Sequence, residues 1–224
     1  MEIVSRTLQP YKELVANLAG ALTILQFFAG IVVCRDIHKN GSTKGFSPMP
    51  FIGGVAIGIL FLQYGVILED RIMILVNLVA IFLNLLYTVF FYVKSEDKKN
   101  EVLKPIAYAV ALDAVLLGYA RSDTPDNVEF SFGFILTALM LFLMGMPLLD
   151  VKEIIKRKDA SSIPFPMTFM GTIVTFFWLL YGVILQNNFM IVQNAIGVFL
   201  CSFQLVLIVI YRPRTRAVRS KKQQ

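Results

Sequence analysis

Long runs of apolar residues, separated by short polar stretches, extend along this chain of 224 residues. A helix needs about 20 predominantly apolar residues to cross a bilayer core about 30 Å thick. Several segments reach or approach that length, and the longest connections between them lie at residues 34–47 and 150–162. The pattern predicts an all-α integral membrane protein whose seven transmembrane helices cover residues 14–34, 48–68, 72–93, 103–120, 130–149, 163–185 and 189–211.

Composition supports a chain that lies mostly in a membrane. Hydrophobic residues make up 57% of it and charged residues 16%, whereas about a quarter of the residues in an average soluble domain are charged. Seven spans leave little of the chain for an extramembrane enzyme domain. The two cysteines, Cys34 and Cys201, are too few and too far apart for a disulfide framework or a zinc site. We expect no metal and no cofactor.

One stretch of the sequence occurs twice. Residues 64–77 (YGVILEDRIMILVN) return as residues 181–194 (YGVILQNNFMIVQN) at an offset of 117, with eight identical positions. Upstream of each copy the prolines recur as well, because Pro50 has its counterpart in Pro166. Two like units that bury into one another in a bilayer are typical of transporters, whose substrate site forms between the repeats. We therefore expect the functional site between the copies.

Basic residues predict the orientation of the chain, because lysine and arginine favour the cytosolic side of a membrane. Arg6, Lys12, Arg71 and Arg121 fall on one side, and all the other lysines and arginines fall on the opposite side. The amino terminus is therefore predicted to be extracellular or lumenal and the carboxyl terminus cytosolic. The basic residues behind the net charge of +6 are then expected to anchor the helix ends at the membrane surface. The basic tail can also contact anionic lipid headgroups. A nucleic-acid partner is not expected.

The two copies share one orientation only if an extra helix separates them. Because each unit has three spans, it ends on the opposite side of the membrane from its start, and a second unit that followed directly would be inverted. The segment 103–120 prevents this, because it carries the chain back across the membrane. The predicted organisation is a first triple-helix repeat at 14–93, a linker helix at 103–120, a second triple-helix repeat at 130–211 and a basic cytosolic tail at 212–224.

Short motifs in a fixed order support a family resemblance. The first copy holds Ala29-Gly30, Gly41-Ser42-Thr43, Pro50-Phe51, Tyr64-Gly65 and Asn77, and the second holds Met146-Pro147-Leu148-Leu149-Asp150, Pro166, Trp178, Tyr181-Gly182 and Asn194. In these residues the chain resembles the SWEET sugar transporters (the MtN3/saliva family), especially the animal or insect-type members, over about residues 14–211. The resemblance implies two parallel three-helix bundles joined by a linker helix (3-1-3), passive transport of mono- or disaccharides, and homo-oligomers that are commonly trimers.

Two asparagines are the leading candidates for binding substrate. A sugar needs neutral groups that both donate and accept hydrogen bonds, and an amide offers two donors and an acceptor. Asn77 and Asn194 lie about a third of the way into apolar segments at equivalent places in the repeats. An unpaired amide in hydrocarbon is costly, so each must face a partner helix or a wet cavity. The alternative is that they only join helices by hydrogen bonds.

Aromatic and apolar residues are predicted to form the walls of this site. The resemblance places Trp178 and its counterpart Phe61 against the sugar ring, and Phe61 lacks the indole N–H that is common there. Trp178 also fits an ordinary membrane-interface tryptophan. By family spacing, the side walls are Gln26, Ile57, Leu143 and Val174.

Prolines and tyrosines are candidates for hinges and gates. Proline inside a span permits a bend, and the resemblance assigns this role to Pro50, Pro147 and Pro166, with Gly30 where a fourth proline is expected. Pro50 and Pro166 equally suit the first turn of a helix. The resemblance assigns the outer gate to two Tyr-Gly pairs, with Asp70 and Asn187 close by; an aromatic belt is the alternative for the tyrosines. The pairs are Tyr64-Gly65 and Tyr181-Gly182.

Asp113 lies in the middle of the predicted linker helix, and a carboxyl group inside a membrane segment is by default a functional candidate. It is expected to be a structural partner or a protonated acid, with proton coupling as the alternative. The leading prediction is a sugar uniporter in the plasma membrane or an internal membrane such as the Golgi. The rivals are a proton-coupled amino-acid transporter of the PQ-loop type and a seven-helix receptor. An enzyme is not expected, because no nucleophile with an adjacent base is evident.

Overall fold

The structure is a computed structural model that describes residues 2–122 and 124–211. Regular secondary structure in these residues is entirely helical, which confirms the predicted all-α fold. The predicted basic tail at 212–224 lies outside the described residues. Within them, seven helical stretches are long and apolar enough to cross a membrane: Glu2–Asn40, Met49–Ile67, Arg71–Lys94, Lys98–Ser122, Asn127–Arg157, Phe165–Leu185 and Asn188–Ile210.

The chain divides into two compact units, which we call the central unit (Gly20–Leu136) and the terminal unit (Met1–Ala19 with Thr137–Gln224). Helices α2 (Lys12–Phe27) and α7 (Pro125–Gly145) each contribute residues to both. This division rests on packing, whereas the repeats of the sequence rest on likeness. The bounds predicted for the repeats therefore stay a prediction.

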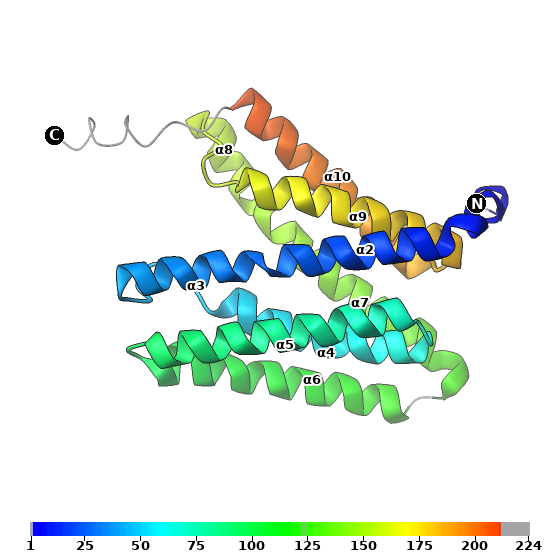
Figure 1. The fold of residues 1–224 in the computed structure, drawn as a ribbon, viewed down its shortest axis with the longest axis horizontal. Helices are drawn as coiled ribbons and strands as arrows, with labels where there is room; N and C mark the ends of the chain where they lie inside the picture. The colour runs from blue at the N-terminus through cyan, green and yellow to red at the C-terminus, as the bar shows by residue number, and fades with distance from the viewer. Residues whose placement is uncertain (1, 123, 212–224) are drawn as a thin grey trace. The chain divides into compact units, whose positions relative to one another are not determined.

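In the central unit, α5 (Arg71–Lys94) packs against α4 (Met49–Ile67) and α3 (Ala29–Asn40) (Figure 1). A π-helical turn, η2 (Lys98–Leu103), leads into α6 (Lys104–Ser122), which packs against α4. This is the predicted linker helix.

Aromatic side chains fill the core at one end of the central unit. Phe51 of α4 and Tyr87 of α5 have ring centroids 5.3 Å apart, and Phe91 is completely buried beside them. The same cluster takes in Ile37 from α3 and Val102 from η2. Three predicted spans and the turn before the linker helix are therefore joined by one apolar core.

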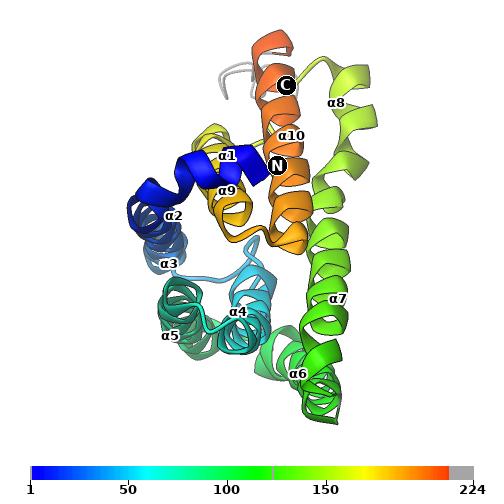
Figure 2. The ribbon, with the colours of Figure 1, turned by 90° about the vertical axis from the view of Figure 1, so that its right-hand side faces the viewer.

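In the terminal unit, α9 (Phe165–Leu185) and α10 (Asn188–Ile210) form a close pair. Figure 2 shows them side by side, with α1 (Glu2–Leu8) lying against α9. The oxygen of Ile184 accepts two hydrogen bonds there, from Ser5 Oγ at 3.2 Å and from Gln9 Nε2 at 3.0 Å. Gln9 belongs to the short 3₁₀ turn η1 (Gln9–Tyr11) that follows α1. The amino-terminal segment thus covers the carboxyl end of α9.

The first predicted helix, 14–34, is interrupted. Helix α2 ends at Phe27 and α3 begins at Ala29, so the predicted span contains a break at Phe28, although the whole stretch Glu2–Asn40 is long and apolar enough to cross a membrane. Just after this break, a Cβ on Gly30 would lie 2.3 Å from Cε2 of Tyr87, so the backbone passes too close to this side chain of α5 for any residue but glycine. An apolar pattern carries no record of such a close approach.

The matching helix of the second repeat is interrupted at the equivalent place. Helix α7 ends at Gly145, and η3 (Met146–Asp150), a 3₁₀ segment, separates it from α8 (Val151–Arg157). Pro147, in η3, stands 117 residues after Gly30. Most of the predicted connection 150–162 is consequently helical.

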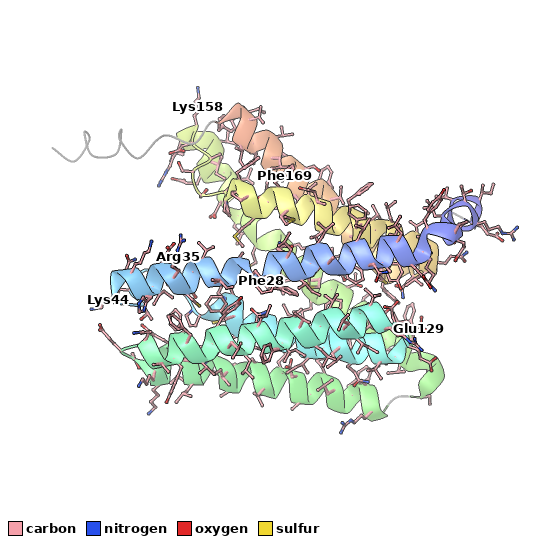
Figure 3. All side chains as sticks on the ribbon, in the orientation of Figure 1. Phe28, Arg35, Lys44, Glu129, Lys158 and Phe169 are labelled. Carbon is pink, nitrogen blue, oxygen red and sulfur yellow. The ribbon has the colours of Figure 1, made fainter. Side chains whose placement is uncertain are left out.

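Several charged side chains lie toward the two ends of the central unit. Figure 3 shows Arg35 and Lys44 at one end of this unit and Glu129 at the other. Lys44 Nζ pairs with Glu96, the closest nitrogen and oxygen atoms being 3.3 Å apart, and both side chains are exposed. The connection after α3 and the connection after α5 therefore meet at the same end, which the charge pattern assigns to the cytosol.

Candidate functional site

The turn between the second and third helices of each repeat is built in the same way twice. A Cβ on Gly65 would lie 3.1 Å from Cβ of Met73, and a Cβ on Gly182 would lie 3.0 Å from Cβ of Met190. In both cases the next backbone nitrogen would be 3.2 Å away. Glycine after the predicted gate tyrosine is therefore what lets α4 approach α5 and α9 approach α10.

An N-terminal cap fixes the start of the third helix in each repeat. Asp70 Oδ1 accepts a hydrogen bond from Met73 N at 2.8 Å, and Asn187 Oδ1 accepts one from Met190 N at 3.0 Å. A side-chain oxygen at this position satisfies one of the backbone N–H groups that a helix leaves unpaired at its start. Asp70, predicted near the gate, thus has a demonstrated structural role.

The two predicted substrate amides sit one turn further along these helices, in matching conformations. Nδ2 of Asn77 donates to Met73 O, and Nδ2 of Asn194 donates to Met190 O, both at 2.8 Å. Asn194 is 6% exposed, and Asn77 is half-buried. Each bond uses one N–H group and leaves the amide oxygen and a second N–H to bind another partner.

Sequence reasoning missed the methionine that organises each copy. Met73 contacts Gly65 through its Cβ, its N–H binds the cap of Asp70, and its carbonyl oxygen holds the amide of Asn77. Met190 repeats these relationships in the second copy. The signal was present, since both methionines belong to the repeated stretch, but their role depends on backbone atoms.

The predicted aromatic walls lie one helix away from these amides in the chain. On α9, the rings of Trp178 and Tyr181 meet edge to face, with centroids 5.9 Å apart and planes at 65°. Tyr181 and its counterpart Tyr64 on α4 are both buried, whereas Trp178 and Phe61 are half-buried. The tyrosines are thus fixed within their units, and the two flat side chains proposed for sugar stacking retain exposed surface.

The four predicted side-wall residues differ in exposure. Val174 of α9 is buried, Ile57 of α4 and Gln26 of α2 are half-buried, and Leu143 of α7 is 37% exposed. Gln26 and Ile57 belong to the central unit, and Leu143 and Val174 to the terminal unit. Their shared role as a substrate wall stays a prediction.

The predicted hinge prolines lie at helix starts. Pro50 is in the first turn of α4 and Pro166 in the first turn of α9, where proline removes no hydrogen bond from within the helix. This is the alternative that the sequence left open. Pro147 lies in η3, at the interruption between α7 and α8. Of the three prolines, it is the one found where a predicted span departs from a regular α-helix.

A third asparagine was not predicted. Asn84 of α5 is 9% exposed, donates from Nδ2 to Ala80 O at 2.8 Å, and lies directly against Gly54, where a Cβ would be 2.6 Å from its Cγ. It follows Asn77 by two helical turns, which is a signal visible in the sequence. Its counterpart 117 residues later is Cys201, so this amide has no equivalent in the second repeat.

Asp113 has an unusual position in α6. It is 6% exposed, and across Lys104–Ser122, all of which the structure describes, it is the one buried residue. Its Oδ1 atom has no hydrogen-bond partner among the described residues. The structure therefore does not supply the tyrosine hydroxyl or other structural partner expected for this oxygen.

Residues 13–99 and residues 130–216 each match one protein family, MtN3/saliva. This family is described as a sugar efflux transporter for intercellular exchange. The chain belongs to the MtN3/saliva (SWEET) family. The match occurs twice and covers most of the chain. Membership of a transporter family agrees with the expectation that the chain is not an enzyme.

Individual relatives support the animal-type assignment. Over 205 residues the chain is 30% identical to the sugar transporter SWEET1 of Drosophila pseudoobscura pseudoobscura, covering 91% of both proteins. It is 32% identical over 188 residues to SWEET1 of Caenorhabditis elegans, covering 84% of this chain and 62% of that protein. A bidirectional sugar transporter, SWEET2a of Oryza sativa subsp. indica, is 28% identical over 213 residues.

A solved structure of a eukaryotic SWEET transporter has the same fold. The match has a TM-score of 0.79 and covers 91% of this chain and 97% of that one, at 20% sequence identity. The arrangement of three helices, one linker helix and three helices is that of the SWEET fold.

Proposed function

We propose that this chain is a passive sugar uniporter that carries mono- or disaccharides in either direction across a membrane by alternating access. Asn77 and Asn194 bind sugar hydroxyls, and Trp178 and Phe61 stack on the ring. Tyr64-Gly65 and Tyr181-Gly182 form the outer gate. The names of the relatives, which are sugar transporters, support the substrate class.

The observation that carries this proposal is the paired conformation of the two amides. Each is held by a single bond to its own helix, from equivalent donors to equivalent methionine oxygens, so each retains one donor and one acceptor. Hydroxyl groups of a sugar both donate and accept, and two neutral amides can bind them without fixing a charge in the membrane. If such an amide served only to join helices, its oxygen and its second N–H group would both be bonded to neighbouring helices.

The test is tracer flux into liposomes that contain the purified protein. Labelled glucose and labelled sucrose are the two probes, and wild type is compared with Asn77→Ala, Asn194→Ala and the control Asn100→Ala. Asn100 is exposed on η2, and its side chain donates a hydrogen bond to the neighbouring Asp97. We expect both amide variants to lose at least about tenfold in flux, because each loses hydrogen bonds to substrate that are worth about 1.4 kcal/mol or more. Full flux in both variants contradicts the proposed site.

A proton-coupled amino-acid transporter of the PQ-loop type is the second candidate. The buried carboxyl of Asp113 favours it. Under this alternative, uptake follows an imposed pH gradient, and Asp113→Asn abolishes that dependence. Uniport predicts equilibration without accumulation under the same gradient.

The orientation, membrane and assembly of the protein are part of the proposal. The amino terminus faces outside or the lumen, and the membrane is the plasma membrane or an internal membrane such as the Golgi. The protein forms homo-oligomers, trimers being the form that the family resemblance suggests, and its basic tail contacts membrane lipid. The sequon Asn40-Gly41-Ser42 provides a test, since attached glycan at Asn40 contradicts a cytosolic location for the end of α3.

A further inference from the structure

The one buried residue of α6 is a carboxylic acid in the middle of a membrane-spanning helix. The half-buried residues Ile106, Ala109, Leu117 and Ala120 recur on the same side of α6 at helical spacing. Ile106 and Ala109 pack on the core that contains Phe51 and Ile52 of α4. Asp113 therefore lies at the centre of the stripe by which α6 packs on α4.

No positive charge faces this carboxyl from the helix it packs against. Helix α4, which the structure describes throughout, contains no Asp, Glu, Lys, Arg, His or Cys, and its titratable side chain is Tyr64 near the opposite end from Phe51. The turn η2, which also contacts α6, carries Lys98, Lys99 and Glu101 before the start of that helix. The other titratable residues of α6 are Lys104, Tyr108, Tyr119 and Arg121.

Distance removes the two cations of α6 from consideration. Lys104 and Arg121 are nine and eight positions from Asp113, which corresponds to about 12–14 Å along the helix axis. Tyr108 is 75% exposed, so it points away from the buried stripe. An ionised Asp113 would thus be a buried carboxylate with no counter-charge and with one oxygen that accepts no hydrogen bond. Such a charge strongly disfavours the packed state, and binding a proton removes it.

We propose that Asp113 is a proton-binding site, such that α6 packs on α4 with this carboxyl protonated, and that loss of the proton loosens the packing and slows transport. The inference rests on the proposed sugar transport for its effect on flux. Helix α4 links the carboxyl group of Asp113 to transport, because the same helix carries Ile57, Phe61 and Tyr64 of the proposed substrate wall and gate. The proton is held in the protein and does not cross the membrane with the sugar.

Two measurements test this proposal on the full chain, one with sugar and one without. The first is exchange of labelled glucose at equal pH on both sides of liposomes, from about pH 5 to about pH 9.5, a range wide enough to include the values at which buried acids lose their proton. The second is the midpoint of thermal unfolding in detergent over the same range. Wild type is expected to lose about fivefold or more in exchange and to unfold at lower temperature as the pH rises.

Two variants separate the proton site from general effects of pH. Asp113→Asn keeps the shape of the protonated acid and cannot ionise, so its exchange is expected to vary by less than about twofold over the whole range. Asp97→Asn is the matched control at the start of η2. Hydrogen bonds from Asn100 hold the pKa of the Asp97 carboxyl below its usual range, so it stays ionised throughout. This control is expected to keep the wild-type profile.

The outcomes distinguish this proposal from the proposed function. A flat wild-type profile with sugar still crossing overturns the proton site and leaves transport intact. A melting profile that depends on Asp113, with neither labelled glucose nor labelled sucrose crossing at any pH, supports the proton site and overturns transport. Accumulation of sugar along an imposed pH gradient overturns the claim that the proton is held, because the proton is then carried.

Discussion

A Cβ on Gly197 of α10 would lie 2.9 Å from Cγ2 of Thr175 on the neighbouring helix α9. The first repeat also has a glycine that lies close to the neighbouring helix, but at a different position. There the glycine is Gly58 on α4, the counterpart of Thr175, and the counterpart of Gly197 is Ala80 on α5. A Cβ on Gly58 would lie 2.9 Å from Cγ1 of Ile81. Both repeats thus keep one close helix pair, but the residue without a side chain changes helix.

The contact between Gly197 and Thr175 predicts a coupled pair of substitutions. Gly197→Ala should lower the free energy of unfolding by about 1–3 kcal/mol, because it overpacks the contact with Thr175. Adding Thr175→Ala removes the clashing methyl group and should recover more than half of that loss. The measurement is a double-mutant cycle of unfolding in detergent. Gly118→Ala is the control, since a Cβ there meets nothing within 4 Å, and simple additivity of the paired changes contradicts the prediction.

The helix cap at Asp70 predicts that two substitutions of this residue differ in their effect on stability. Asp70→Ala removes the acceptor for Met73 N and should cost about 0.5–2 kcal/mol of stability. Asp70→Asn should cost much less, because Asn187 performs the same capping in the second repeat. Unfolding in detergent gives both values. Equal losses in the two variants would show that the charge of Asp70, and not its capping oxygen, is what stabilises the helix.

The amino-terminal segment is predicted to stabilise the carboxyl end of α9. Ser5 and Gln9 both donate to Ile184 O, and Gln186 Nε2 donates to Ser5 Oγ at 3.3 Å. The double variant Ser5→Ala with Gln9→Ala should lose about 1–3 kcal/mol of local stability. Hydrogen exchange at residues 181–187 should then be faster.

A neighbouring hydroxyl provides the matched control for this experiment. Thr7 Oγ1 donates to Ile3 O within α1 and is exposed. Thr7→Ala should leave exchange at 181–187 unchanged, while faster exchange in this control as well would indicate that α1 had unfolded generally. The first repeat offers a comparison inside the same protein, because Glu69, the counterpart of Gln186, has the same left-handed backbone and an exposed side chain.

The apolar pattern predicted the seven spans because each needs only a sufficient run of apolar residues, a property of local sequence. It showed neither the break at Phe28 nor the close approach of Gly30 to Tyr87, 57 residues away, because neither changes the run of apolar residues. The contact of Ser5 with Ile184 was likewise invisible, since a polar residue before the first span gives no sign of its partner.

The candidate site also has a part that the sequence predicted and a part that it could not predict. Repetition of the sequence identified Asn77 and Asn194, and the structure gives them matching hydrogen bonds. The part played by Met73 and Met190 could not be predicted, because it rests on backbone N–H and C=O groups that every residue carries. The close approaches at Gly58 and Gly197 also required the structure, since neither glycine is repeated in sequence.

The aromatic walls give a prediction that bears directly on the substrate. Phe61 lacks the indole N–H and some of the stacking area of its counterpart Trp178. Phe61→Trp should therefore lower the half-saturating sugar concentration in exchange assays by about two- to tenfold, the equivalent of about 0.5–1.5 kcal/mol. Trp178→Phe should raise it by a similar factor. Phe82→Trp is the control, since Phe82 is 61% exposed on α5 among other exposed apolar side chains such as Leu78 and Leu85. A change in maximal rate without a change in half-saturation in both variants would place the two rings outside the binding site, as parts of the moving helices only.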